Sequence, residues 1–266
     1  MNKISNVSKL NQKRIATILN GANHTITVEE AATLLAMTKN EVAKLMSRWI
    51  EQGWFARIKR GLYVSIKPDA RGLPLNDPWI IATKIYSPSY IGALSAAEYW
   101  GFANKKNSGI DVFSTQKPRN RNPVINNSIH FIVRTIPQQT MFGLAPITRQ
   151  QVTVMVSDPS RTIIDFMLDP KLAGGILSVI DIFSQYLISE HRNMDLLFSY
   201  AKKILNGAVL KRLGYLLERC RPSEFNTIVF CKMLMTTGNI KLDPQLCGKK
   251  LITRWGLWVP EGWTFV

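Results

Sequence analysis

The sequence predicts an α+β protein of two domains, and three observations lead to this prediction. Near the N-terminus, two helix-start signals of the same form stand eleven residues apart. A stretch rich in proline and glycine, residues 68–78, then reads as a linker to the rest of the chain. Beyond it, helical stretches, then runs of β-branched residues and then further helical periodicities indicate a larger mixed α/β C-terminal domain over residues 79–266.

The first domain, residues 1–67, is expected to contain three helices. An opening helix over residues 8–19 is followed by Gly21, which suits its end. The next two helices begin where a threonine is followed three residues later by a glutamate, at Thr27 with Glu30 and at Thr38 with Glu41. In such a capping box the threonine hydroxyl accepts a hydrogen bond from the third helical N–H, and the glutamate reaches back to the threonine N–H. The first capped helix is expected over residues 28–35.

The second capped helix carries apolar residues at helical spacing on one side, namely Val42, Leu45, Met46, Trp49 and Ile50. Gly53 suits the end of this helix. Two short runs, residues 54–58 and 62–64, flank a turn at residues 59–61 and predict a β-hairpin with a basic tip. Three helices followed by such a hairpin indicate a winged helix-turn-helix.

A winged helix-turn-helix binds DNA by placing its second helix in the major groove, which admits one α-helix. The candidate DNA contacts are the polar residues that the apolar side leaves outward and the basic residues of the hairpin: Thr38, Lys39, Asn40, Lys44, Ser47, Arg48, Arg57, Lys59 and Arg60. Helix residues of this kind suit base edges, whereas hairpin cations suit phosphates or the minor groove. The expected partner is double-stranded DNA.

The second domain is expected to open with a helix over residues 79–85, a turn at 90–92 and a helix over 93–100. Strands are expected at residues 111–115, 129–135 and 151–156, which are rich in β-branched and aromatic residues. From Pro159 the pattern turns helical. The expected helices cover residues 160–168, 176–188, 194–205, 208–220 and 225–235, and a final strand and turn are expected over 251–266.

The chain is strongly basic, which favours a polyanionic partner. Its 34 Lys and Arg against 18 Asp and Glu give a formal net charge of +16, of which +7 falls on residues 1–72 and +9 on residues 73–266. The second domain can therefore contact nucleic acid or an acidic protein, although a generally basic, solvated surface is the other interpretation. The candidate basic strip on its late helices consists of Lys202, Lys203, Lys211 and Arg212.

The sequence contains no strong catalytic, cofactor or metal motif. There is no G-x-x-x-x-G-K-[ST] loop, no dinucleotide glycine fingerprint and no G-x-S-x-G element. Asp158, Asp165 and Asp169 form the best carboxylate cluster, but their spacing is more typical of surface or capping residues than of metal ligands.

Three cysteines without a C-x-x-C pair favour neither a disulfide framework nor a zinc site, and fit a reducing cytoplasm. No uncharged apolar run of about 18 residues occurs, so a membrane segment is not expected.

Five phrases of the sequence, taken in order, carry a family resemblance. They are R-I-K-R-G-L-Y-V at residues 57–64, Y-I-G-A-L-S-A-A-E-Y-W-G at 90–101, V-S-D-P-S-R-T-I-I-D at 156–165 with Gly174-Gly175 after it, K-R-L-G-Y-L-L-E at 211–218, and R-W-G-L at 254–257. Together they resemble the AbiEi family of antitoxins, the repressor halves of bacterial AbiE-type (type IV) toxin–antitoxin pairs. The resemblance spans residues 10–266.

The resemblance implies a repressor that binds inverted repeats in its own promoter through the winged helix. It also implies that the C-terminal domain opposes a co-encoded nucleotidyltransferase-like toxin, with or without a stable complex. The basic strip is the candidate surface for this antitoxin activity. In the D-P-x-R-T phrase we expect Arg161 to be a scaffold residue that ties the strand end to the helix.

Two other functions stay open at this point. One is a DNA-acting enzyme that the winged helix recruits to nucleic acid, which metal-dependent activity would distinguish. The other is a stand-alone transcription regulator whose second domain senses a small ligand, which a large apolar pocket in that domain would indicate.

Overall fold

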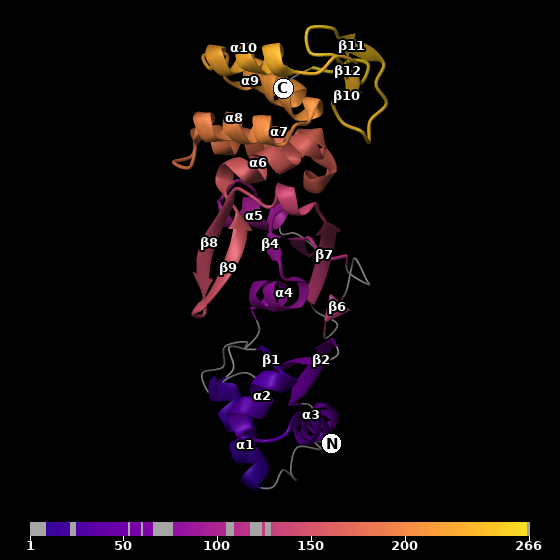
Figure 1. The fold of residues 1–266 in the computed structure, drawn as a ribbon. Helices are drawn as coiled ribbons and strands as arrows, with labels where there is room; N and C mark the ends of the chain where they lie inside the picture. The colour runs from indigo at the N-terminus through magenta and orange to yellow at the C-terminus, as the bar shows by residue number, and fades with distance from the viewer. Residues whose placement is uncertain are drawn as a thin grey trace. The chain divides into compact units, whose positions relative to one another are not determined.

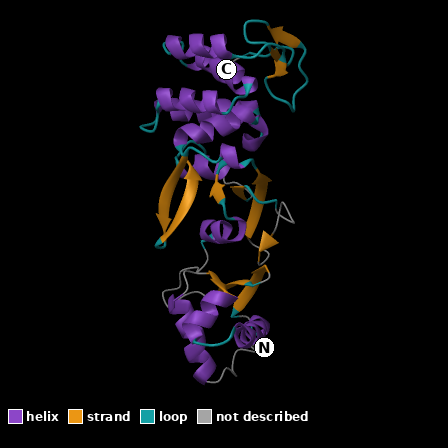
Figure 2. Ribbon diagram, in the orientation of Figure 1, coloured by secondary structure: helices purple, strands orange, loops and turns teal. Residues whose placement is uncertain are grey.

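The computed structural model describes residues 9–21, 25–52, 54–59, 61–65, 77–104, 109–117, 124–125 and 129–264. At positions 56, 58, 59, 124, 125 and 129 it describes the backbone alone. The chain is an α+β protein, as the sequence predicts (Figure 1, Figure 2). It divides into two compact units: the N-terminal unit has residues 1–90, 112–135 and 146–155, and the C-terminal unit has residues 91–111, 136–145 and 156–266.

The first elements of the N-terminal unit are three helices and three strands. The helices are α1 (Lys9–Gly21), α2 (Val28–Leu35) and α3 (Lys39–Glu51), and the strands are β1 (Thr25–Thr27), β2 (Phe55–Lys59) and β3 (Leu62–Ser65). The strands form an antiparallel sheet in the order β1-β3-β2. These elements enclose one hydrophobic core, whose largest side chain, Trp49, is fully buried with its ring centroid 6.0 Å from that of Phe55.

Both capped helices are confirmed, and the opening helix continues to Gly21 rather than ending before it. Strand β1 is not predicted by the sequence. It forms because Thr25, Ile26 and Thr27 pair with β3, and a strand of three residues is too short to show a period in the sequence. Gly53 lies outside the described residues.

A six-stranded sheet follows, in the order β6-β7-β5-β4-β9-β8. Its strands are β4 (Ser89–Ile91), β5 (Ile110–Ser114), β6 (Val124–Ile125), β7 (Ile129–Thr135), β8 (Leu144–Arg149) and β9 (Val152–Ser157). The three expected strands are confirmed as β5, β7 and β9. The predicted turn at residues 90–92 is wrong for its first two residues, because they lie in β4, which pairs in parallel with β9 through Ile91 and Val156.

The helices of this region are also confirmed. Helices α4 (Pro78–Tyr86) and α5 (Ala93–Tyr99) precede and follow β4. The later ones are α6 (Pro159–Leu168), α7 (Ile176–Ile188), α8 (Met194–Lys203), α9 (Gly207–Cys220) and α10 (Phe225–Leu234). The tail, expected as one strand and a turn, forms β11 (Lys250–Ile252) and β12 (Leu257–Val259), which join β10 (Ile240–Lys241) in a sheet ordered β10-β12-β11.

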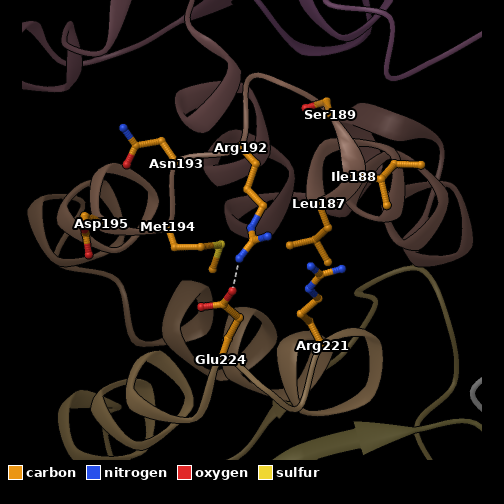
Figure 3. Close-up of a pocket in the computed structure, with 9 residues that line it drawn as sticks. All are labelled: Leu187, Ile188, Ser189, Arg192, Asn193, Met194, Asp195, Arg221 and Glu224. Atoms are coloured by element: carbon orange, nitrogen blue, oxygen red, sulfur yellow. Dashed lines mark hydrogen bonds and ion pairs between the residues drawn. The ribbon is translucent and has the colours of Figure 1, made fainter.

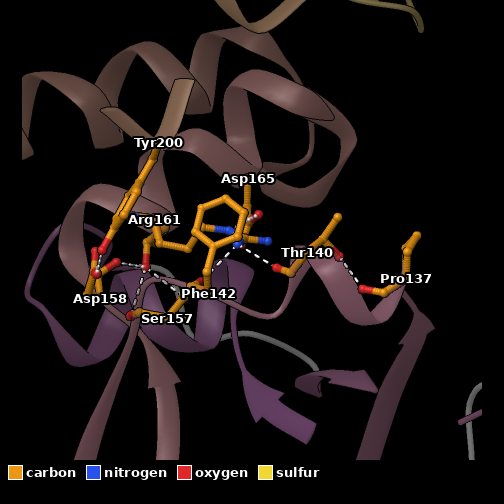
Figure 4. A network of polar contacts seen from close by, with 9 residues as sticks. Pro137, Thr140, Phe142, Ser157, Asp158, Arg161, Asp165 and Tyr200 are labelled. Atoms are coloured by element: carbon orange, nitrogen blue, oxygen red, sulfur yellow. Dashed lines mark hydrogen bonds and ion pairs between the residues drawn. The ribbon is translucent and has the colours of Figure 1, made fainter. Parts of the chain in front are cut away.

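The junction between β9 and α6 depends on Asp158, which caps α6 (Figure 4). Its carboxylate accepts hydrogen bonds from the Arg161 N–H at 2.8 Å and from the Tyr200 hydroxyl at 2.7 Å, and its own N–H donates to the Gly143 carbonyl at 2.9 Å. Gly143 has a φ of +66°, and a Cβ there would lie 2.9 Å from Arg161 Cβ and from the Tyr200 ring. Only glycine therefore fits this close approach.

The Arg161 side chain is 2% exposed and joins α6 to the segment that leads into β8. Its Nε donates to Asp165 Oδ1 at 2.8 Å, and its Nη1 donates to the carbonyls of Thr140 and Phe142 at 2.7 and 2.9 Å. The guanidinium also lies 4.4 Å from the centroid of the Phe142 ring. The scaffold role expected for Arg161 is confirmed, with one difference: it ties α6 to the segment before β8 rather than to the end of β9.

The expected basic strip is wrong at two of its four positions, because Lys211 and Arg212 are 1% and 4% exposed. The Lys211 ammonium donates to the Gly238 carbonyl. The Arg212 guanidinium donates to four backbone carbonyls at 2.8–3.2 Å, those of Met167, Leu168, Lys241 and Leu242. A buried cation is tolerated only when its donors are hydrogen-bonded, so these two residues hold α9 against its neighbours and cannot form a surface.

The Arg161–Asp165 pair gives a stability prediction. Replacing Arg161 by methionine should lower the free energy of unfolding by about 3–5 kcal/mol, because the Asp165 carboxylate is left buried without its cation. The double variant Arg161→Met with Asp165→Leu should recover only part of that loss, because it removes the unpaired carboxylate but leaves the carbonyls of Thr140 and Phe142 without their donor. Urea denaturation measures both. The same substitution at Arg254, whose side chain is 60% exposed in its ion pair with Glu218, should cost at most about 1 kcal/mol. Equal losses at Arg161 and Arg254 would contradict the scaffold role.

Candidate nucleic-acid interface

The start of α3 is fixed by a complete capping box. The Thr38 hydroxyl accepts a hydrogen bond from the Glu41 N–H at 3.4 Å, and the Glu41 carboxylate accepts from the Thr38 N–H at 3.0 Å and from the Thr38 hydroxyl at 2.7 Å. These bonds lower the pKa of the Glu41 carboxyl from its usual value, so this group is ionised at neutral pH. Just before it, Ala36 has a φ of 49° and its N–H turns back to the last carbonyls of α2. Helix α3 is thus held at a set angle to α2.

Burial of one side fixes the rotation of α3 about its own axis. Val42, Met46 and Trp49 are fully buried, and Leu45 and Ile50 are partly buried against the same core. The apolar side that the sequence predicts is therefore confirmed. Since this side packs inward, the residues half a turn away must face solvent.

The outward side of α3 presents four polar residues in one row. Asn40, Lys44, Ser47 and Arg48 are all exposed, at the i, i+4, i+7, i+8 spacing of a single helix face, and we call them the α3 row. The Ser47 hydroxyl donates to the Ala43 carbonyl at 3.1 Å, which leaves its lone pairs free to accept. Among the described residues, Lys44 and Arg48 have no salt-bridge partner. The row offers amide, ammonium and guanidinium donors and a hydroxyl acceptor.

Thr38 and Lys39 are exposed as predicted, but both are already engaged within the domain. The Thr38 hydroxyl takes part in the capping box of α3. The Lys39 ammonium lies 3.0 Å from the Glu29 carboxylate, with the two side chains 66% and 63% exposed, and this contact lowers the pKa of Glu29. An ion pair this exposed contributes little, so Lys39 can exchange Glu29 for another anion at small cost.

Acidic residues border the α3 row, and sequence reasoning missed them. Glu41 and Glu51 are exposed, and they lie on the same helix face as Lys44 and Arg48. Arg14 of α1 lies near enough to Glu41 to lower the pKa of that carboxyl together with Lys44. The signal was present in the sequence, because the period that places Lys44 and Arg48 outward places both glutamates there too.

The predicted hairpin is present as strands β2 and β3, with a register irregularity between Arg57 and Lys59. Arg57 is exposed, as expected. The Lys59 side chain and all of Arg60 lie outside the described residues. The antiparallel pair is therefore confirmed, whereas its basic tip stays a prediction.

Two residues of the basic strip, Lys202 and Lys203, are exposed on α8. The Lys202 ammonium lies 5.0 Å from the centroid of the Phe198 ring, and the Lys203 ammonium lies 4.3 Å from that of Phe142. Contacts of this kind hold lysine stems against an apolar surface while leaving the charge accessible. They are the part of the strip that a partner can reach.

An open pocket of about 730 Å³ lies in the C-terminal unit, between the end of α7, the start of α8 and the start of α10 (Figure 3). The Arg192 guanidinium pairs with the Glu224 carboxylate across it, and Arg221 also points into it. Asn193 and Asp195 add further polar lining. A sensor of apolar ligands needs an enclosed and mainly apolar cavity, so this pocket does not favour the ligand-sensing alternative.

The three candidate carboxylates have structural partners. Asp158 caps α6, Asp165 pairs with Arg161, and Asp169 accepts a hydrogen bond from the Lys171 N–H at 3.1 Å. Within the described ranges, no group of three or more His, Cys, Asp or Glu residues is placed to hold a metal ion.

The chain matches no protein-family model, and no curated protein gives a significant match. In the part of the chain that the structure describes, none of the helices combines the length and the apolar character that crossing a bilayer requires.

The capping box gives a prediction for the candidate interface. Thr38→Ala should lower the free energy of unfolding by about 0.5–2 kcal/mol, because one N–H at the start of α3 loses its acceptor, whereas Thr38→Asn should cost much less. Tryptophan fluorescence during urea unfolding measures the loss. The control is Thr17→Ala on α1, where the hydroxyl bonds back to the Lys13 carbonyl within the helix. A loss at Thr17 as large as that at Thr38 would rule out a special role for the cap.

Proposed function

We propose that this chain is a DNA-binding repressor and that its residues 9–65 act as a winged helix-turn-helix. The observation that supports the proposal most is the division of α3 into two sides. Val42, Met46 and Trp49 anchor one side in the core, and the α3 row projects from the other. A rigid helix with protruding donors is what reading of a major groove requires.

The chemistry of the α3 row matches the edges of base pairs. An asparagine amide such as that of Asn40 can pair with adenine N6 and N7, and an arginine such as Arg48 can pair with guanine O6 and N7. Lys44 also suits guanine, and the Ser47 hydroxyl, which donates to the Ala43 carbonyl, can accept from a base donor. With 13 residues, α3 is about 20 Å long, enough for these four residues to span several base pairs.

Phosphate contacts would come from the residues around the row. Arg57 is exposed on β2, next to the predicted tip residues Lys59 and Arg60. At the start of α3, Lys39 can exchange its exposed Glu29 partner for a phosphate, whereas Thr38 is engaged with Glu41 in the capping box. Contacts of this kind supply affinity and register without reading sequence.

The resemblance to AbiEi antitoxins extends the proposal. On this basis the DNA consists of inverted repeats in the protein's own promoter, and the C-terminal unit counteracts a co-encoded nucleotidyltransferase-like toxin. Lys202 and Lys203 are the candidate contacts for that activity, because they are the exposed residues of the predicted strip.

The DNA-binding proposal is tested with the DNA upstream of the protein's own reading frame. Lys44→Ala and Arg48→Ala should each weaken binding by about 1–3 kcal/mol if they contact bases, and should reduce discrimination against unrelated DNA. Gel shifts at fixed salt measure both quantities. Lys13→Ala removes the same charge from an exposed position on α1 and is the matched control.

Arg57→Ala serves as a second arm, because a phosphate contact behaves differently from a base contact. It should weaken binding to all DNA sequences alike and reduce the slope of log K against log salt by about 1. Parent-like binding by both the Lys44 and Arg48 variants would show that α3 is not the reading helix.

Antitoxin activity is tested by growth rescue in cells that express the toxin encoded beside this protein. The double variant Lys202→Ala with Lys203→Ala should rescue growth less well than the parent at equal protein level, because the candidate contact surface loses both charges. Its DNA binding should stay unchanged. Full rescue by this variant would remove the two lysines from the mechanism.

A further inference from the structure

Helix α10 is apolar on its outer side as well as on its inner side. Ile228 and Cys231 are buried, and the helix lies beside α9 (Figure 1). Four large apolar residues of α10 are 48–71% exposed: Phe230 and Met233 lie on the opposite side, and Phe225 and Leu234 lie at its flanks. A helix that is apolar all round is normally covered on all sides, and exposed apolar residues that gather in one place mark an interaction surface.

Five exposed residues and the half-buried Val229 form a continuous stripe. Asn226, Val229, Phe230 and Met233 follow the i, i+3, i+4, i+7 spacing of a helix–helix seam, and Phe225 and Leu234 flank them. We call these six residues the α10 stripe. The Phe230 ring is held in place by stacking on Phe198 of α8, with 5.6 Å between centroids, so this aromatic group is already positioned for a partner.

We infer that the α10 stripe is the interface of a homodimer, in which α10 packs antiparallel against α10 of a second copy about a two-fold axis. The stripe is arranged symmetrically around the point between Val229 and Phe230. An antiparallel copy therefore places Phe230 opposite Val229, Met233 opposite Asn226 and Leu234 opposite Phe225. A two-fold interface needs such self-complementarity, because the same surface must serve on both copies.

The distribution of charge favours a second copy over a charged partner. The chain carries a net charge of +16, so two copies repel each other on average, and a surface without charges is where this repulsion opposes packing least. The α10 stripe contains no charged residue. Lys232 is the charged residue of α10, and its ammonium is bonded to the Arg254 carbonyl. An acidic partner would instead require cations within the contact surface. Antiparallel pairing also brings opposite ends of the two helix dipoles together.

The length of the stripe sets the expected strength of the dimer. A helix of 10 residues is about 15 Å long, which gives an interface well below the roughly 800 Å² per partner of a standard stable complex. We therefore expect a weak dimer whose population rises with concentration. This inference goes beyond the proposed function and does not depend on DNA binding.

Sedimentation equilibrium of the full chain, without DNA, tests the dimer between about 1 µM and about 1 mM. The parent should shift from the monomer mass of 30.1 kDa toward twice that mass and no further. Met233→Asp and Phe230→Asp should weaken association at least about tenfold, because each buries a charge against its copy. Asn226→Leu should strengthen association, since it removes the polar residue from the seam, and a misfolded chain would not produce a tighter dimer that stops at two copies.

Leu177→Asp is the matched control, because Leu177 is 62% exposed on α7, away from the stripe, and should leave association unchanged. A parent that stays monomeric throughout the range would overturn the inference. So would Met233→Asp and Phe230→Asp variants that associate like the parent. If the parent is monomeric but binds vesicles of phosphatidylserine through Phe230 and Met233, the stripe is a membrane-contact surface and the dimer is refuted.

Discussion

A buried positive charge must have its donors hydrogen-bonded, and this constraint organises the C-terminal unit. Arg161 donates to the carbonyls of Thr140 and Phe142 and to the Asp165 carboxylate. Arg212 donates to the last two carbonyls of α6, to the Lys241 carbonyl in β10 and to the Leu242 carbonyl that follows it. Each guanidinium thus joins segments that are distant along the chain, and neither can be lost without leaving several acceptors buried and unpaired.

The lysine and arginine side chains of α3 are exposed, unlike the buried arginines of the C-terminal unit. There the anchor is apolar, because Trp49 and its neighbours fill the core, and the cations point outward. This difference decides what each set of charges can do. Lys211 and Arg212 have their donors occupied by backbone carbonyls, whereas Lys44 and Arg48 are exposed and can bind an external acceptor. A strongly basic composition therefore does not by itself indicate how much of the charge is available to a partner.

Features that depend on residues close together in the sequence were predictable, and features that depend on distant residues were not. The capped helices, the apolar side of α3 and the later helices were predictable because their signals lie within a few residues of one another. Strands β1 and β4 were not, because each is short and forms through a partner far along the chain. The burial of Lys211 and Arg212 is not predictable from the sequence, because the elements that cover α9 lie elsewhere along the chain: Arg212 bonds to the end of α6, and a Cβ at Gly214 would lie 2.2 Å from the Trp255 ring.

The two glutamates beside the α3 row limit what α3 can contribute in the proposed function. Glu41 and Glu51 are exposed on the face that carries Lys44 and Arg48, so the face has two charges of each sign. A neutral face gains little from counterion release, which is the main source of affinity for DNA of any sequence. The carboxylates would also repel phosphates wherever the donors of the row find no base acceptors. Helix α3 would therefore supply discrimination between sequences, while the hairpin supplies affinity, and this division suits a repressor that must leave unrelated DNA free.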